Sequence, residues 1–190
     1  MKRTIIVYIG ESILDVLEQA PNRRYEVDEI FRSFNSGRYP SQREETMAQE
    51  DMIFFLQEVW EPSPTGRYEP GMEQRQHSPA EIASLSLLDI VDTDQVILLR
   101  PDNPRGVFCA NLIENVLRNE ELRGKPGYPD CGENLIVKDI KDVVERFTIF
   151  DFTGAPKREI PHVCSIAMRL NAEIICLEED RSGLIRYLYS

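Results

Sequence analysis

The sequence predicts an α/β fold in which helices cover both faces of a doubly wound, mostly parallel open sheet. Continuous apolar, β-branched runs at residues 4–9 and 95–100 are typical of strands that are buried on both faces. Amphipathic helical segments alternate with these runs, and a strand–helix–strand order favours a parallel sheet. At 190 residues the chain is long enough for one such domain, so we expect a single domain over residues 1–190.

Six strands are expected, and the last two differ from the others in their connection. The tight turn at residues 179–183 is short enough for a hairpin, so the final strand is predicted to be an antiparallel strand at the sheet edge. The predicted strands cover residues 4–9, 95–100, 134–137, 147–152, 173–177 and 184–189.

Helices are predicted in the segments between the strands, and most have a recognisable start. A serine followed three residues later by an acidic residue forms a capping box, and asparagine before proline is a strong start signal. The predicted caps are Ser12 with Asp15, Ser41 with Glu44, Ser78 with Glu81, and Asn103 before Pro104. The predicted helices cover about residues 13–20, 26–36, 41–59, 78–89, 103–117, 139–146 and 160–170.

Residues 61–77 interrupt this pattern. The segment contains three prolines and two glycines, which break regular elements. We therefore expect a flexible loop or a lid over residues 61–77.

Charge, cysteine spacing and the lengths of the apolar runs argue against several classes of function. The net charge of −11 disfavours binding to DNA or long RNA, although a small anion could still bind in a local basic pocket. The four cysteines form no C-x-x-C pair and are expected to be reduced thiols in a cytoplasmic protein. No signal peptide, membrane span or metal-ligand cluster is expected, and no cofactor is predicted.

The candidate site lies where three predicted parallel strands end. Ligands of doubly wound, Rossmann-like sheets bind beyond the carboxyl ends of the strands, where the strand order switches. The segments at those ends are Gly10–Ser12, Arg100–Asn103 and Asp151–Lys157. A helix start offers unpaired N–H groups to an anion, and a glycine allows close approach of the backbone. The dinucleotide fingerprint G-x-G-x-x-G and the Walker lysine loop are both missing, so NAD and ATP are disfavoured.

In their order and spacing, these three segments resemble the CARF domain, the CRISPR-associated Rossmann fold. The family shows a G-T-S-like turn after strand one, here Gly10-Glu11-Ser12, and a T-G-G-x-K-like turn after strand four, here Thr153 to Lys157. The resemblance implies a homodimer that binds cyclic oligoadenylate. The chain has no room for a fused nuclease domain, so it looks like a stand-alone ring nuclease acting on cyclic tetra- or hexa-adenylate.

The resemblance also implies roles for individual residues. Ser12 and Lys157 would be catalytic, holding a 2′-hydroxyl in line with its own phosphodiester and stabilising charge, to give linear products with 2′,3′-cyclic phosphate ends. Two departures from the family pattern are Glu11 in place of threonine and Ala155-Pro156 in place of the second glycine and its neighbour. The implied ligand-binding residues are Gly10, Glu11, Arg100, Asp102, Asn103, Asp151, Thr153, Gly154 and Ala155.

Three alternatives remain open from the sequence. The chain could be a CARF-type sensor that binds the ring without cleaving it, or an unrelated small-molecule enzyme on a flavodoxin-like sheet. The polar residues could also be purely structural, with Ser12 only a helix cap and Asp151 only a turn residue.

Overall fold

A six-stranded mixed sheet forms the centre of the molecule. The computed structural model describes residues 3–19, 27–61, 72–140, 147–155 and 160–187. The strand order is β3-β2-β1-β4-β5-β6, in which β5 and β6 are antiparallel and all other neighbouring pairs are parallel. The predicted doubly wound sheet with an antiparallel edge strand is therefore confirmed. The strands are β1 Thr4–Tyr8, β2 Gln95–Arg100, β3 Leu135–Asp139, β4 Ile149–Asp151, β5 Glu173–Leu177 and β6 Leu184–Tyr187.

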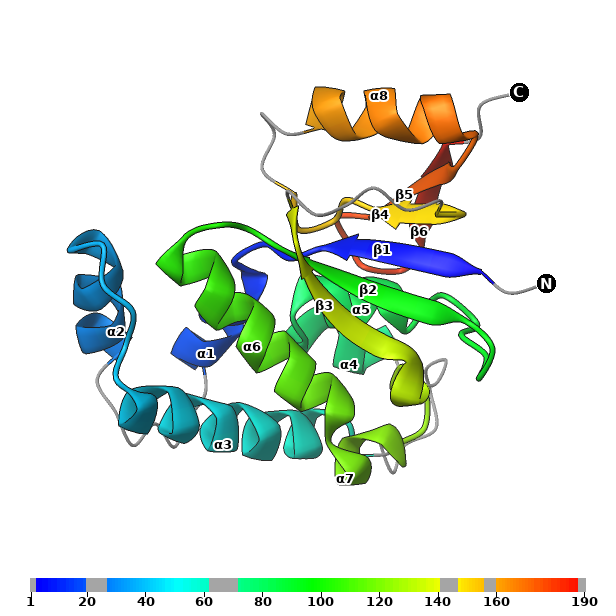
Figure 1. Cartoon of the computed structure of the whole chain (residues 1–190). Coiled ribbons are helices and arrows are strands. Elements are labelled where there is room, and N and C mark those ends of the chain that lie inside the picture. Colours follow the sequence, from blue (N-terminus) through cyan, green and yellow to red (C-terminus); the bar gives the residue numbers. More distant parts are fainter. Residues whose placement is uncertain (1–2, 20–26, 62–71, 141–146, 156–159, 188–190) are drawn as a thin grey trace.

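Helices lie on both sides of this sheet, in unequal numbers (Figure 1). On one side α5 and α6 pack on the strands, α1 packs against both of these helices, and α3 lies against α1 and α6. On the other side α8 packs against β5. The helices are α1 Ser12–Gln19, α2 Val27–Asn35, α3 Gln42–Val59, α4 Met72–His77, α5 Ala80–Leu85, α6 Pro104–Arg118, α7 Glu120–Arg123 and α8 Ile160–Leu170, with a 3-10 turn at Gly132–Asn134.

Alternate residues of the central strand build the two cores. Ile5 and Val7 of β1 belong to the larger core under α1, α3, α5 and α6, and Ile6 and Tyr8 belong to the smaller core under α8. Because successive side chains of a strand point to opposite faces, a strand covered on both sides must be apolar throughout. This requirement explains why the predicted runs at residues 4–9 and 95–100 contain no alternation with polar residues.

Four local predictions differ from the structure. Helix α5 ends at Leu85, four residues before the predicted end at residue 89. Residues Met72–His77 form helix α4, so the predicted loop 61–77 is wrong for its last six residues, and 62–71 lie outside the described residues. Asp139 ends strand β3 instead of starting a helix, while residues 141–146 are not described. Strand β4 spans three residues, Ile149–Asp151, instead of the predicted 147–152.

Two serines predicted to cap the helices that follow them make other hydrogen bonds instead. Ser78 does not cap α5: its hydroxyl donates to the carbonyl of Gln74 and accepts from the indole N–H of Trp60. Ser12 is the first residue of α1, and its hydroxyl accepts the backbone N–H of Ala80 at 2.8 Å, so it caps α5 instead of its own helix. In contrast, the capping box of Ser41 and Glu44 is present as predicted.

Candidate functional site

The carboxyl ends of β1, β2 and β4 meet at one edge of the sheet, as predicted. In the order 3-2-1-4-5-6 the chain winds outward from β1 in one direction to β2 and β3, and in the other to β4 and β5. The connections that leave the neighbouring ends of β1 and β4 diverge there, which opens a crevice at that point.

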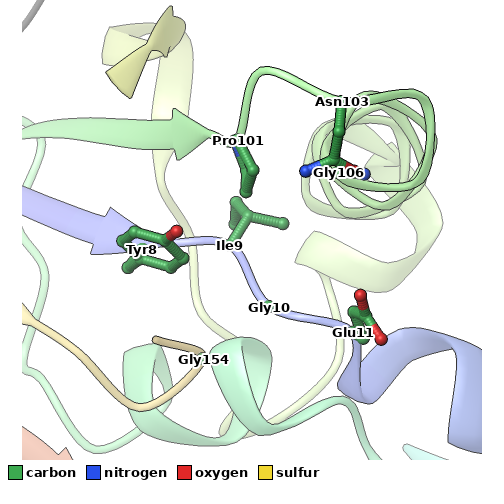
Figure 2. A pocket seen from close by; sticks show the side chains of 8 residues that line it. All are labelled: Tyr8, Ile9, Gly10, Glu11, Pro101, Asn103, Gly106 and Gly154. Carbon is green, nitrogen blue, oxygen red and sulfur yellow. Dashed lines mark hydrogen bonds between the residues drawn. The ribbon is translucent and has the colours of Figure 1, made fainter. Parts of the chain in front are cut away.

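A pocket of about 320 Å³ lies at this edge, between the ends of β1 and β2 and the start of α6 (Figure 2). It contains four of the predicted ligand-binding residues, Gly10, Glu11, Asn103 and Gly154. The remaining lining supplies apolar walls from β1 and from the segment after β2. The lining residues are Tyr8, Ile9, Gly10, Glu11, Pro101, Asn103, Gly106 and Gly154.

Helix α6 points its amino end at the pocket. The side chain of Asn103 caps the helix by accepting the N–H of Gly106 at 2.8 Å, and Pro104 occupies the first turn, as the sequence predicts. A Cβ at Gly106 would lie 2.6 Å from the Cβ of Pro101, so only glycine allows the helix to approach the end of β2 this closely. The helix dipole therefore favours negative charge at this side of the pocket.

Two glycines close the floor of the pocket where β1 and β4 end. A Cβ on Gly154 would lie 2.5 Å from the backbone nitrogen of Gly10 and 2.6 Å from the carbonyl oxygen of Tyr8. A Cβ on Gly10 would in turn lie 2.8 Å from the Cα of Gly154. These contacts are shorter than any real side chain tolerates, so the two turns touch through their backbones and the site requires both glycines.

A buried carboxylate lies directly beneath this contact. Glu81 of α5 is fully buried, and its Oε1 accepts the backbone N–H of Gly10 at 2.8 Å. Its Oε2 accepts the hydroxyl of Ser12, which itself accepts from Ala80. Burial raises the pKa of Glu81, and the bonds from Ser12 and Gly10 oppose that rise. Two of the donors expected to meet a ligand are thus engaged by the protein's own carboxylate.

A second buried carboxylate fixes the end of β4. Asp151 is fully buried and accepts the hydroxyl of Ser84, together with the backbone N–H and the hydroxyl of Thr153 at 3.0 and 2.6 Å. Burial raises its pKa to about 6. The Thr153 hydroxyl also accepts the N–H of Leu177 at 2.9 Å. Asp151 and Thr153 thus join β4 to α5 and β5, and their polar groups serve the fold.

The other predicted residues lie outside the pocket lining. Arg100 forms a 2.7 Å ion pair with Asp139 across β2 and β3. Asp102 is exposed beside the pocket, and the N–H of Ala155 closes a turn onto the carbonyl of Phe152 at 2.8 Å. Lys157 belongs to residues 156–159, which lie outside the described part of the chain.

Two charged residues at this site, Glu81 and Arg105, are not among the predicted site residues. The spacing of Ser78 and Glu81 predicts a local capping box, whereas Glu81 makes long-range contacts with Gly10 and Ser12. Arg105 follows the Asn103–Pro104 cap, and its Nε lies 3.2 Å from Oε2 of the pocket residue Glu11. A cation in the first turn of a helix is unfavourable because it opposes the helix dipole. This unfavourable position is the feature of the sequence that indicates a functional role for Arg105.

Comparison with known proteins gives no family for this chain. No protein-family model matches it, and its sequence has no significant match among curated proteins. None of the helices in the described segments is long and apolar enough to cross a membrane. Across the same segments, no group of three or more His, Cys, Asp or Glu side chains is arranged to hold a metal ion.

Proposed function

We propose that the chain binds a cyclic oligoadenylate, with the pocket between β1, β2 and α6 holding one nucleotide unit. The observation that carries this proposal is the position of the pocket: it joins the turn after β1, the start of α6 after β2, and Gly154 after β4. These are the three segments on which the resemblance to CARF domains rests. Its volume is at the lower end of the range of about 300–1,000 Å³ for small-molecule sites, which suits one nucleotide better than a whole ring.

The lining has the chemistry that a nucleotide needs. Tyr8 and Ile9 line the pocket but are almost fully buried, so the apolar surface for a base or a ribose face comes mainly from Pro101. The amino end of α6, with Asn103 at its cap, offers a favourable potential for a phosphate. A tetra- or hexa-adenylate ring has more units than one such pocket holds, so the proposal includes a homodimer in which two copies share the ring.

Binding is better supported than cleavage by the polar contacts of the described residues. The hydroxyl of Ser12 is engaged by Glu81 and Ala80, and the carboxyl of Asp151 is engaged by Ser84 and Thr153. These contacts favour the sensor hypothesis over the ring-nuclease hypothesis. Cleavage by attack of a 2′-hydroxyl on its own phosphodiester would then depend on Lys157 for charge stabilisation.

The binding proposal is tested with Asn103→Asp. Aspartate is an equally good helix cap, so α6 keeps its start, but the new negative charge faces the bound phosphate. We expect affinity for cyclic tetra- or hexa-adenylate, measured by calorimetry, to fall about tenfold or more. The matched control is Asn119→Asp, because Asn119 caps α7 in the same way, through the N–H of Leu122 at 3.0 Å, away from the pocket.

Two outcomes would contradict the binding proposal. One is the absence of binding by the wild type to rings of either size. The other is an equal loss of affinity in both aspartate variants. Cleavage is followed separately, with radiolabelled ring in the presence of EDTA: turnover that disappears in Lys157→Ala supports the ring nuclease, and tight binding without turnover supports the sensor.

A further inference from the structure

The rim of the pocket carries an ion pair between two segments that are far apart in the sequence. Arg105 is the second residue of α6, and Glu11 follows β1 and lines the pocket. Their Nε and Oε2 atoms are 3.2 Å apart. The Glu11 side chain lines the pocket and is 58% exposed, and the partly exposed Arg105 side chain adjoins the lining through this ion pair.

Aromatic rings hold the guanidinium of Arg105 in place. Its central carbon lies 5.2 Å from the ring centre of Phe31 and 5.9 Å from that of Phe34, both on α2. The Phe34 ring in turn packs edge-on against the fully buried Phe108, at 5.4 Å. A guanidinium that rests on aromatic faces loses little conformational freedom when it binds an anion, because its position is already fixed.

The pairing with Glu11 leaves the guanidinium incompletely satisfied. The Nε atom of Arg105 is shielded from solvent, yet it makes no hydrogen bond of acceptable geometry to the described residues, Glu11 included. A buried donor without an acceptor costs free energy that a correctly placed oxygen would recover. Glu11 therefore neutralises the charge of Arg105 without satisfying its hydrogen-bonding capacity.

We propose that Arg105 binds the phosphate of the ligand at the mouth of the pocket, and that Glu11 is an internal stand-in which this phosphate displaces. The identification of the anion as a nucleotide phosphate rests on the proposed function, whereas the exchange itself rests on the geometry of the rim. A phosphate offers several oxygens to the planar fork of a guanidinium, and it would lie at the amino end of α6, where the helix dipole adds attraction.

The exchange accounts for a feature of the sequence that otherwise opposes binding. Glu11 places a negative charge beside a pocket proposed for a phosphate, where the CARF pattern often has threonine. If Glu11 occupies the position of the ligand phosphate, it neutralises Arg105 in the free protein and sets a threshold for binding. A weak or singly charged anion would then compete poorly, whereas a nucleotide held by its base as well would succeed.

The test uses substitutions with opposite expected effects. Glu11→Gln removes the competing charge, so affinity for cyclic tetra-adenylate should rise about three- to tenfold. Arg105→Gln removes the guanidinium that binds the phosphate, so affinity should fall about ten- to a hundredfold. Arg105→Lys keeps the charge but loses the planar fork, so it should fall between the wild type and Arg105→Gln.

The matched control is Glu114→Gln, which breaks an ion pair of similar length on the same helix. Arg118 and Glu114 are 3.0 Å apart at the other end of α6, so their loss should leave affinity unchanged. A second readout separates phosphate binding from a structural role. Arg105→Gln should lower the dependence of log affinity on log salt concentration, whereas a merely loosened fold should leave that slope unchanged.

The outcomes separate this proposal from the proposed function. If the wild type binds the ring but Glu11→Gln fails to strengthen binding, or if both substitutions weaken it equally, the exchange is overturned and the function stands. If the wild type binds no ring, the proposed function fails, and adenosine monophosphate and pyrophosphate become the probes. Opposite effects of the two substitutions on those probes would support the exchange, and equal effects would overturn it. If Arg105→Gln does not fold, the effect of Glu11→Gln alone decides whether the exchange stands: stronger binding supports it, and unchanged or weaker binding overturns it.

Discussion

At the scale of the residue, the burial of Asp151 makes stability depend on pH. Its folded-state pKa is raised from 3.8 to about 6, and desolvation is the largest cause. As pH rises above about 4, the carboxyl ionises first in the unfolded chain, so stability falls until the folded carboxyl has also ionised near pH 6. Nearby Glu81, whose pKa is also raised, contributes in the same direction.

We therefore predict that Asp151→Asn gains stability relative to the wild type as pH increases. The amide keeps an oxygen for Thr153 and offers an N–H to the hydroxyl of Ser84. A shift of about two pKa units corresponds to about 3 kcal/mol, so the variant should gain up to that amount between pH 4 and pH 7.5. Urea unfolding of both proteins at several pH values measures the difference. A difference that does not change with pH would contradict the prediction.

The contact between Gly10 and Gly154 gives a second prediction at this scale. Gly154→Ala places a Cβ 2.5 Å from the nitrogen of Gly10, so the ends of β1 and β4 must separate. We expect a loss of about 3 kcal/mol of stability, the upper end of the cost of overpacking, together with weakened ring binding. In the control Gly124→Ala, the nearest atom to the new Cβ is 3.8 Å away, and stability should remain equal or rise by about 0.5 kcal/mol. Chemical denaturation measures both, and equal effects at the two positions would refute the argument.

At the scale of the element, helix α4 depends on a distant arginine. Arg181, in the turn between β5 and β6, donates through Nη1 to the carbonyls of Arg75 at 2.8 Å, Gln76 at 3.3 Å, and Ser78. These carbonyls belong to the last turn of α4 and the residues after it, where a helix leaves acceptors unpaired. In return, the Nε of Arg75 donates to the carbonyl of Arg181 at 3.2 Å.

We predict that Arg181→Met destabilises α4 more than the rest of the protein. Loss of hydrogen bonds from a charged donor should cost about 2 kcal/mol, and amide hydrogen exchange should accelerate first in α4. The control Arg186→Met breaks an exposed ion pair with Glu173 at 2.9 Å and should change stability by less than about 0.5 kcal/mol. Uniform acceleration of exchange across the sheet would show that Arg181 has no special relation to α4.

The range of a hydrogen bond along the chain decides which elements the sequence could predict. The capping box of Ser41 and Glu44 was predicted correctly because both partners lie within one helical turn. An identical pattern at Ser78 and Glu81 misled, since Glu81 bonds to Gly10, 71 residues away. Helix α4 was not predicted for a related reason. Arg181 supplies the hydrogen bonds at its carboxyl end, and nothing in the sequence of residues 72–77 indicates that contact.

At the scale of the whole molecule, the doubly wound sheet with its antiparallel edge strand was predicted, whereas the contacts of the candidate site were predicted only in part. Strands that alternate with helices and are joined by right-handed crossovers leave few sheet topologies, and the positions of Gly10, Asn103 and Gly154 at the carboxyl edge follow from that topology. The contacts of Glu81 and Arg105 depend on how α5 and α6 rotate against the strand ends. That rotation is set by packing, and no local pattern specifies it.

Charge is also a property of the whole molecule, and it gives the last prediction. A net charge of −11 makes the folded surface repel itself, and the exposed residue Glu179 follows Glu178 and precedes Asp180 in an acidic turn. Replacing Glu179 with lysine changes the net charge from −11 to −9, because one negative charge becomes one positive charge. We expect Glu179→Lys to raise stability by about 0.5 kcal/mol at low salt, where this repulsion is poorly screened.

The dependence on salt distinguishes this effect from any local change at the turn. At about 0.5 M NaCl the screening length falls to a few ångströms, so the gain from Glu179→Lys should disappear. The wild type itself should become more stable as salt rises over the same range. Thermal unfolding of both proteins at low and high salt measures the two effects. A gain that persists at high salt would mean that the lysine acts through a local contact, and self-repulsion would then not be its cause.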